Sequence, residues 1–103
     1  MTKQSKTMPI LPSWSVYGNY SSNNYGAHAL RFDVGGNSFW FSYKTLVAFQ
    51  KSVGDCVVHQ NVWGTTTGKH LNAIDGGNKK HRLNAANFEA AFVQTFGRSF
   101  AVA

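Results

Sequence analysis

The chain has 103 residues, of which ten are Lys or Arg and four are Asp or Glu, so its formal net charge is +6 at pH 7. This length corresponds to one domain with a single core. One cysteine excludes an internal disulfide bond, and no apolar run is typical of a membrane span or a signal peptide. We therefore expect a cytoplasmic protein, and its basic charge favours partners such as nucleic acid or a nucleoprotein.

The first elements in chain order are an arm and a hairpin. Residues 1–12 are polar and basic and contain Pro9 and Pro12, which predicts a flexible N-terminal arm. Residues 13–103 are then a single α+β domain. The aromatic and β-branched residues of 14–20 predict a first strand, and the Ser and Asn residues of 21–24 predict a turn into a second.

The second strand shows the alternation of a sheet that has one buried and one wet face. In residues 29–34, Leu30, Phe32 and Val34 alternate with small or charged residues, which predicts that they face the core. Arg31 is then expected to point into solvent. Residues 35–37, Gly-Gly-Asn, predict a tight turn.

Further strands are expected after that turn. Phe39, Phe41 and Tyr43 alternate with Trp40 and Ser42, which predicts a third strand over residues 39–43. Residues 44–50 fit either a strand or a helical turn, and we favour a strand. Gly54 and Asp55 predict a turn, and residues 56–62 predict a further strand in which Cys56 lies in the core.

Two helices are expected in the last third of the chain. A threonine run precedes a short helix over residues 69–74, which ends at Gly76 and Gly77. Asn84 is a good N-cap for a helix over residues 85–96, whose apolar residues recur every three or four positions. The fold class is therefore α+β: a three- to five-stranded antiparallel sheet with a short helix and a C-terminal helix packed on one face.

The segment of residues 62–83 is the best candidate for a functional site, because it holds four cations (Lys69, Lys79, Lys80 and Arg82) and one acid, Asp75. Its Gly-Thr-Thr-Thr-Gly-Lys run, residues 64–69, departs from a nucleotide-binding loop in spacing and in the residue after the lysine. Thr66 and Thr67, backed by Lys69, are candidates to hold a backbone phosphate. The alternative is that these threonines only cap and pack the helix.

Catalytic and metal sites are not indicated by the sequence. The four histidines lack the spacing of zinc ligands, so we expect no metal and no cofactor. Asp75 and His70 are the only acid and base close in sequence, but Asp75 is expected instead to end its helix or to pair with Lys79 or Arg82. We therefore expect a binding protein and not an enzyme.

Exposed aromatic side chains are a second kind of candidate. Trp40 and Trp63, with the tyrosines, are candidates to stack on nucleic-acid bases or to anchor a protein partner. The alternative for each is packing in the core, which is favoured for Phe39 and Phe41. For Trp40, whose neighbours in register are polar, both exposure and packing in the core stay open.

Two motifs carry a resemblance to known proteins: Phe41-Ser-Tyr-Lys-Thr-Leu-Val-Ala-Phe49 and Trp63-Gly-Thr-Thr-Thr-Gly-Lys-His-Leu-Asn-Ala-Ile-Asp-Gly-Gly77. Through them the chain resembles, over about residues 28–97, a small uncharacterised domain of phages, plasmids and mobile elements of gut bacteria. It also resembles an anti-CRISPR protein that inhibits type II effector nucleases. The N-terminal arm and first strand diverge from this pattern.

The resemblance implies a phage or mobile-element accessory protein in the cytoplasm of a bacterial host, which inhibits a type II CRISPR-Cas effector by stoichiometric binding. A basic inhibitor is expected to bind phosphates of the guide RNA or target DNA, or an acidic patch of the effector. The alternative is a module that binds nucleic acid without sequence preference. Replacing the four cations with Ala is expected to abolish inhibition and preserve the fold. The residues expected to contact the partner are Lys69, His70, Lys79, Lys80, Arg82, Thr66, Thr67, Trp40 and Trp63.

Overall fold

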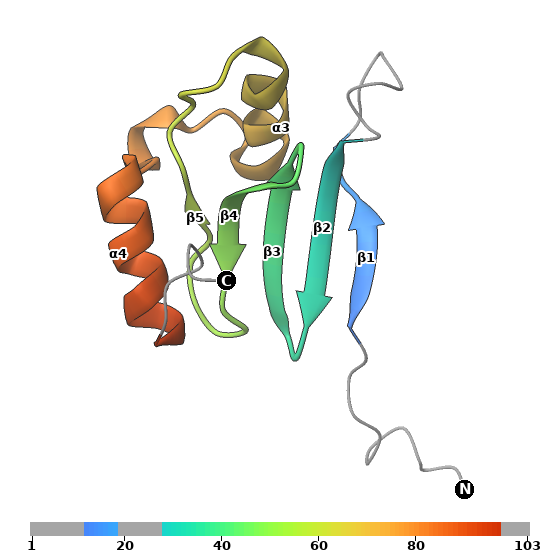
Figure 1. Ribbon diagram of the computed structural model, residues 1–103, viewed down its shortest axis with the longest axis vertical. Coiled ribbons are helices and arrows are strands. Elements are labelled where there is room, and N and C mark those ends of the chain that lie inside the picture. Colours follow the sequence, from blue (N-terminus) through green and yellow to red (C-terminus); the bar gives the residue numbers. More distant parts are fainter. Residues whose placement is uncertain (1–11, 19–27, 98–103) are drawn as a thin grey trace, which may run out of the picture.

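The computed structural model describes residues 12–18 and 28–97 as a five-stranded antiparallel sheet with helices (Figure 1). The strands pair in chain order: β1 (Ser13–Val16), β2 (Ala29–Val34), β3 (Asn37–Ser42), β4 (Thr45–Gln50) and β5 (Val57–Val58). They are followed by α3 (Thr65–Asp75), the 3-10 helix η1 (Lys79–His81) and α4 (Ala85–Phe96). The predicted α+β class is confirmed. The arm over residues 1–11 and the turn over residues 21–24 lie outside the described residues.

Two-residue turns join the central strands. Gly35 and Gly36 have φ angles of 58° and 84°, which confirms the predicted turn between β2 and β3. Between β3 and β4 the same role falls to Tyr43 and Lys44, whose φ angles are 51° and 72°. Residues with side chains adopt positive φ uncommonly, so the sequence carried no signal for this turn. The Tyr43 ring stacks on His28 with 4.3 Å between ring centroids.

The two long helices cover opposite faces of the sheet. Trp40 pairs with Ala48, and both pack with Leu71 of α3. The neighbouring pair, Phe39 and Phe49, packs with Phe88 of α4. Since successive residues of a strand point to opposite faces, α3 and α4 lie on different sides. The expectation that both helices pack on one face is wrong, because each face of the central strands carries its own apolar residues.

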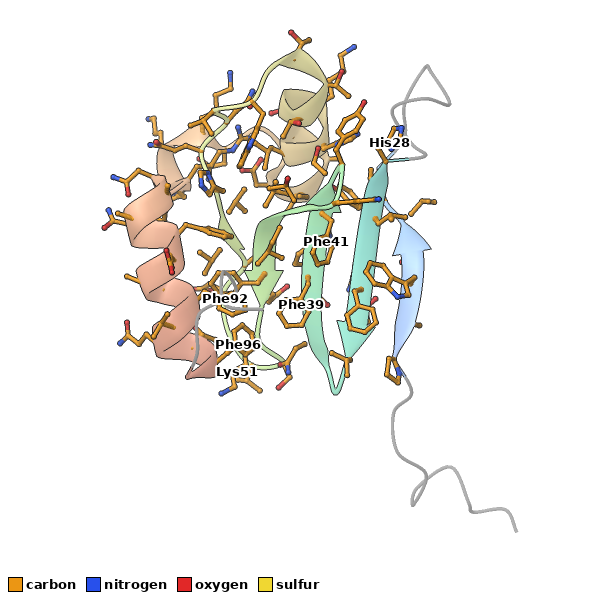
Figure 2. All side chains as sticks on the ribbon, viewed as in Figure 1. His28, Phe39, Phe41, Lys51, Phe92 and Phe96 are labelled. Carbon is orange, nitrogen blue, oxygen red and sulfur yellow. The ribbon has the colours of Figure 1, made fainter. Side chains whose placement is uncertain are left out.

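The α4 side of the core is aromatic. Phe49 is 1% exposed and meets Phe88 and Phe92 edge-on, with ring centroids 5.3 and 5.1 Å apart. Phe92 and Phe96 also reach Phe39 of β3 (Figure 2). The predicted ends of the helix are confirmed. The side chain of Asn84 accepts a hydrogen bond from the backbone N–H of Asn87, and Gly97 has a φ of 81°.

The α3 side of the sheet corrects two predictions about exposure. Trp40 is 7% exposed, so it belongs to the core and is not a surface platform. Ala29, expected on the wet face of β2, is fully buried, whereas Leu30 and Phe32 are only half-buried. Arg31 on that same face lies over the Trp40 ring, 5.0 Å from its centroid, and is not simply in solvent. The position of α3 thus decides which residues of β2 are buried.

The remaining expectations concern the outer segments. Residues 44–50 largely form a strand, as favoured, but only Val57 and Val58 of the predicted strand over residues 56–62 are one. Cys56 is exposed and not in the core. The helix expected over residues 69–74 begins earlier, at Thr65. None of the described helices is long and apolar enough to cross a membrane.

Candidate functional site

A parallel bridge on the outer side of β5 brings the candidate segment together. Leu83 lies beside His59. Its backbone N–H donates to Val58 O over 2.9 Å, and the N–H of Gln60 donates to Leu83 O over 2.7 Å. These bonds tie the chain before α4 to the chain that leaves β5. The residues beside the bridge, Gln60 and Arg82, therefore lie in the same region of the molecule, although they are far apart in the sequence.

Arg82 joins this segment to α3. Its Nε donates to Oδ2 of Asp75 over 2.7 Å, and its Nη2 donates to Oδ1 of the same carboxylate over 2.9 Å. Nη2 also donates to Oδ1 of Asn72 over 3.0 Å. The Arg82 side chain is only 3% exposed. Of the pairings left open for Asp75, the one with Arg82 is confirmed, and it ties the C-terminal end of α3 in place.

The surroundings of Asp75 stabilise its charged form. Partial burial alone would raise the pKa of this carboxyl group, but hydrogen bonds from Arg82 and Gly77, the Arg82 charge and the backbone of Asn78 outweigh it. The pKa of Asp75 is therefore lowered from its usual 3.8. Asp75 is an anion at neutral pH and compensates the buried guanidinium.

The loop before α3 is held by one amide. Oδ1 of Asn61 accepts the N–H groups of Trp63 and Gly64, over 3.0 and 3.1 Å, while its Nδ2 donates to Gly64 O. Gly68 of α3 lies directly against this amide, because a Cβ atom at Gly68 would be 2.9 Å from Nδ2 of Asn61. The glycine inside the helix thus permits the close approach of the loop.

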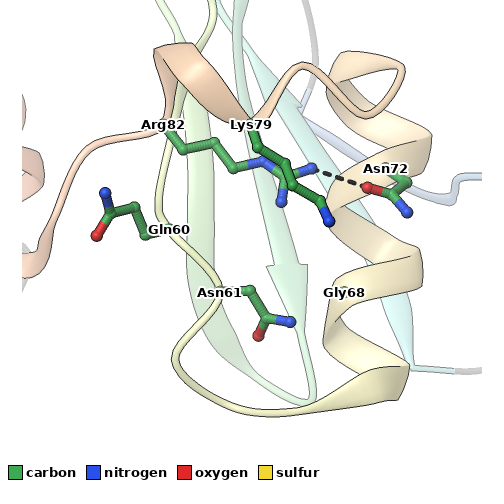
Figure 3. A pocket seen from close by; sticks show the side chains of 6 residues that line it. All are labelled: Gln60, Asn61, Gly68, Asn72, Lys79 and Arg82. Carbon is green, nitrogen blue, oxygen red and sulfur yellow. Dashed lines mark hydrogen bonds between the residues drawn. The ribbon is translucent and has the colours of Figure 1, made fainter.

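These parts enclose a polar pocket of about 390 Å³ (Figure 3). Its lining contains two cations and three neutral amides and no carboxylate; the residues are Gln60, Asn61, Gly68, Asn72, Lys79 and Arg82. Its volume is in the range of ligand-binding pockets, about 300–1,000 Å³. The pocket is therefore rich in hydrogen-bond donors, and it is suited to an anion.

The predicted cations fall into three environments. Lys79 and Lys80 of η1 are exposed, and neither has an ion-pair partner within residues 12–18 and 28–97. Lys69 is exposed on α3 but does not line the pocket. Arg82 is 6% exposed and paired with Asp75, so it is not part of an open basic surface. The structure unites Lys79 and Arg82 in one site and leaves Lys69 outside it.

Two predicted contact residues belong to a buried network instead. Oγ of Ser42 is hydrogen-bonded to Oγ1 of Thr67 over 2.9 Å and to Nδ1 of His70 over 2.7 Å. His70 is fully buried and Thr67 is 8% exposed, so their assignment as contact residues is wrong. The alternative that the threonines pack the helix holds for Thr67, while Thr66 is half-buried. His70 is hydrogen-bonded to Ser42, and Asp75 is paired with Arg82.

The exposed aromatic side chains differ from those expected. Trp63 is 43% exposed and rests on His59, with 4.7 Å between ring centroids, in the loop that Asn61 holds. Trp14, which the sequence analysis had placed only in a strand, is 59% exposed over Phe32 and Phe41. Of the two tryptophans proposed as contacts, only Trp63 is therefore accessible.

The sequence analysis missed the neutral part of the pocket. Gln60, Asn61 and Asn72 carry no charge and belong to no motif, and the bridge between His59 and Leu83 brings them together. A hint for Asn72 was its place three residues before Asp75, since residues at that spacing share a helix face. No group of three or more potential metal ligands occurs in the part of the chain that the structure describes.

Comparison with known proteins identifies a family. No curated protein and no solved structure matches the chain. The profile of a family of unknown function, DUF8033, matches residues 13–90, which include the whole sheet, α3 and the pocket residues. The chain therefore belongs to the DUF8033 family.

Proposed function

We propose that this protein is a non-catalytic binding protein that holds the backbone of a nucleic acid on the side formed by α3 and η1. The observation that carries the proposal is the pair Lys79 and Lys80, exposed and without an acidic partner among the described residues, beside a pocket with no carboxylate. It would serve a phage or mobile element in the cytoplasm of a bacterial host.

Charge supports this proposal over a surface for basic partners. Of the four acids, Asp33 and Asp75 are bound by arginines, which leaves Asp55 and Glu89 exposed outside these pairs. Ammonium groups without a carboxylate partner displace counterions from phosphates, and that release is the main source of affinity in binding without sequence preference. Trp63 adds an exposed ring on which a base can stack, in the loop held by Asn61, which also lines the pocket.

The salt dependence of oligonucleotide binding tests the proposal. We expect affinity for a single-stranded oligonucleotide to fall steeply between about 50 and 200 mM salt. Lys79→Ala and Lys80→Ala, made separately, should each lower the magnitude of the log–log salt slope by about 0.7, because each removes one phosphate contact. Fluorescence anisotropy of a labelled oligonucleotide measures the slope.

The matched control is Lys51→Ala, which removes the same charge from an exposed position after β4, at the opposite end of the sheet (Figure 2). It should leave the slope unchanged. Equal slopes for all three variants would argue against a site at η1. Arg82 is not replaced in this set, because losing one partner of its buried ion pair with Asp75 would destabilise the protein. The expectation that replacing all four cations with Ala preserves the fold therefore does not hold for Arg82.

Inhibition of a type II CRISPR-Cas effector, which the resemblance implies, is a second proposal. The distribution of acids favours one route for it. The chain has only four acids and a formal net charge of +6, and arginines bind two of these acids, so its surface cannot imitate DNA. An inhibitor of this kind would instead bind guide RNA or target DNA. The same cations on η1 then contact phosphates within the effector complex.

Order of addition in a plasmid-cleavage assay tests the second proposal. The protein is added in stoichiometric excess before the guide RNA, after the guide RNA, or after the target DNA. We expect cleavage to be inhibited only in the earlier orders, because phosphates already held by the effector are no longer open to the inhibitor. Full cleavage in all three orders would remove this proposal for the effector tested and leave the nucleic-acid-binding module.

A further inference from the structure

We propose that the polar pocket lined by Gln60, Asn72, Lys79 and Arg82 binds a phosphate group carried on a larger molecule. This inference rests on the proposed function and assigns it a specific site. The pocket holds donors from three separate segments, the end of β5, α3 and η1, and none of its six lining residues is acidic (Figure 3). Such a lining repels cations, and an apolar group there would leave its polar side chains without hydrogen-bond partners.

Arg82 supplies a buried donor that the fold leaves unused. Its Nε and Nη2 atoms are bonded to Asp75 and Asn72, but Nη1 has no hydrogen bond to any residue of the described part of the chain. The side chain is 3% exposed and lines the pocket. Because a buried donor without a partner costs about 1–3 kcal/mol, an acceptor at this position is favoured.

The ion pair with Asp75 orients this donor. The carboxylate occupies the edge of the guanidinium formed by Nε and Nη2, which fixes the plane of the group. The Nη1 side is therefore held toward the pocket before a ligand enters. A donor that is already oriented loses little conformational entropy on binding.

Asn72 and Lys79 supply further donors. Oδ1 of Asn72 accepts from Arg82, which assigns the amide and leaves Nδ2, with two N–H groups, without a partner among the described residues. Lys79 is exposed and lines the pocket from η1. Figure 3 shows both side chains extending into the space beside Arg82. The side-chain amide of Asn61, by contrast, is already hydrogen-bonded within its own loop.

This geometry favours phosphate over a carboxylate. Donors on three segments approach from different directions, which suits the tetrahedral oxygens of a phosphate better than the planar pair of a carboxylate. The volume of about 390 Å³ exceeds that of one ion, so part of the carrying molecule enters as well. Two sources share this chemistry: the terminal phosphate of a strand or nucleotide, and an internal backbone phosphate.

The test uses inorganic phosphate as the probe, titrated into the full chain at constant ionic strength and followed by NMR of backbone and side-chain amides. We expect saturable shifts at Gln60, Asn72 and Lys79. Asn72→Asp keeps the oxygen that accepts from Arg82 and replaces the free amide with a charged oxygen. It should weaken phosphate binding about tenfold or more, because the added carboxylate repels the anion at short range.

Two further variants keep the test decisive. Asn87→Asp adds the same charge at an exposed position in the first turn of α4 and should bind phosphate as the unmodified protein does. Gln60→Glu places a carboxylate in the pocket from an exposed residue, so it tests the site even if Asn72→Asp does not fold. Equal affinity in the pocket variants and in Asn87→Asp, or shifts that do not saturate, would overturn the inference.

Oligonucleotides with and without a 5′-phosphate distinguish the two sources and separate this inference from the proposed function. A terminal-phosphate site predicts tighter binding of the phosphorylated strand, and this preference should be lost in Asn72→Asp. A site for internal phosphates predicts equal binding of both strands, weakened in Asn72→Asp. If neither strand binds while inorganic phosphate still saturates the pocket, the nucleic-acid function fails and the phosphate site stands.

Discussion

Replacing Arg82 with methionine is expected to lower the free energy of unfolding by about 3–5 kcal/mol, the cost of removing one partner from a buried ion pair. The Asp75 carboxylate, 13% exposed, would lose both of its bonds to Arg82. Asn72 would lose its bond as well, so the contact between α3 and the segment before α4 would loosen. Urea denaturation followed by circular dichroism measures the change.

Arg31→Met is the matched control for this prediction. Arg31 also donates from Nε to a carboxylate, that of Asp33, but the side chains of this pair are 42% and 33% exposed. Exposed pairs contribute about 0–1 kcal/mol, so Arg31→Met should have a much smaller effect. Equal losses in the two variants would show that the Arg82 pair is not a structural anchor.

The ion pair between Arg82 and Asp75 also makes the folding stability depend on pH. The pKa of Asp75 is lower in the folded protein than its usual 3.8, so its contribution is present above that value. The contribution is lost as the pH falls through the lower, folded-state pKa. Stability should therefore fall less steeply on acidification below about pH 4 in Arg82→Met than in the unmodified protein. The pKa of Asp33 is also lowered, chiefly by its hydrogen bond from Ser38, but Asp33 contributes equally to the pH dependence of the unmodified protein and of Arg82→Met.

Phe88→Ala is the second substitution with a large expected effect, a loss of about 3–5 kcal/mol. Phe88 is fully buried, and its ring lies 5.3 Å from that of Phe49 and 4.9 Å from that of His59, measured between centroids. Removing it opens a cavity between α4 and the sheet. Because small domains have only about 5–15 kcal/mol of stability, a large part of the variant should be unfolded at elevated temperature.

Val93→Ala controls for a shortened side chain in the same helix. Val93 is 40% exposed, so its loss leaves no cavity and should change stability by no more than about 0.5 kcal/mol. Urea midpoints of the two variants, measured together, give the comparison. If Phe88→Ala were as stable as Val93→Ala, α4 would not pack on β4 as described.

Local sequence signals predicted the parts of the fold that depend on neighbouring residues. The glycines of residues 35–36 permit positive φ wherever they are placed, and Asn84 and Gly97 can cap a helix in any surroundings. The strand over residues 29–34 followed from its alternation of apolar with small or charged residues, and a strand was favoured over a helical turn for residues 44–50. These features therefore agree with the structure.

The candidate site was predicted only in part. Charge and glycine content pointed to the segment of residues 62–83, and Lys79 and Arg82 do line one pocket. Gln60 and Asn61 come from outside that segment, and they join it through backbone bonds between Val58, Gln60 and Leu83. Neutral amides have no charge pattern in the sequence, so only their position in space marks them as part of a site.

The sequence by itself determined the basic charge, the α+β class, the central turn, the C-terminal helix and the segment that holds the pocket cations. Only the tertiary structure decided that α3 and α4 cover opposite faces, that Trp40 and His70 are buried, and that Arg82 is paired inside the protein. Turns and caps depend on a few neighbouring residues. Burial depends on which distant element covers a side chain, and a pattern along one strand does not contain that information.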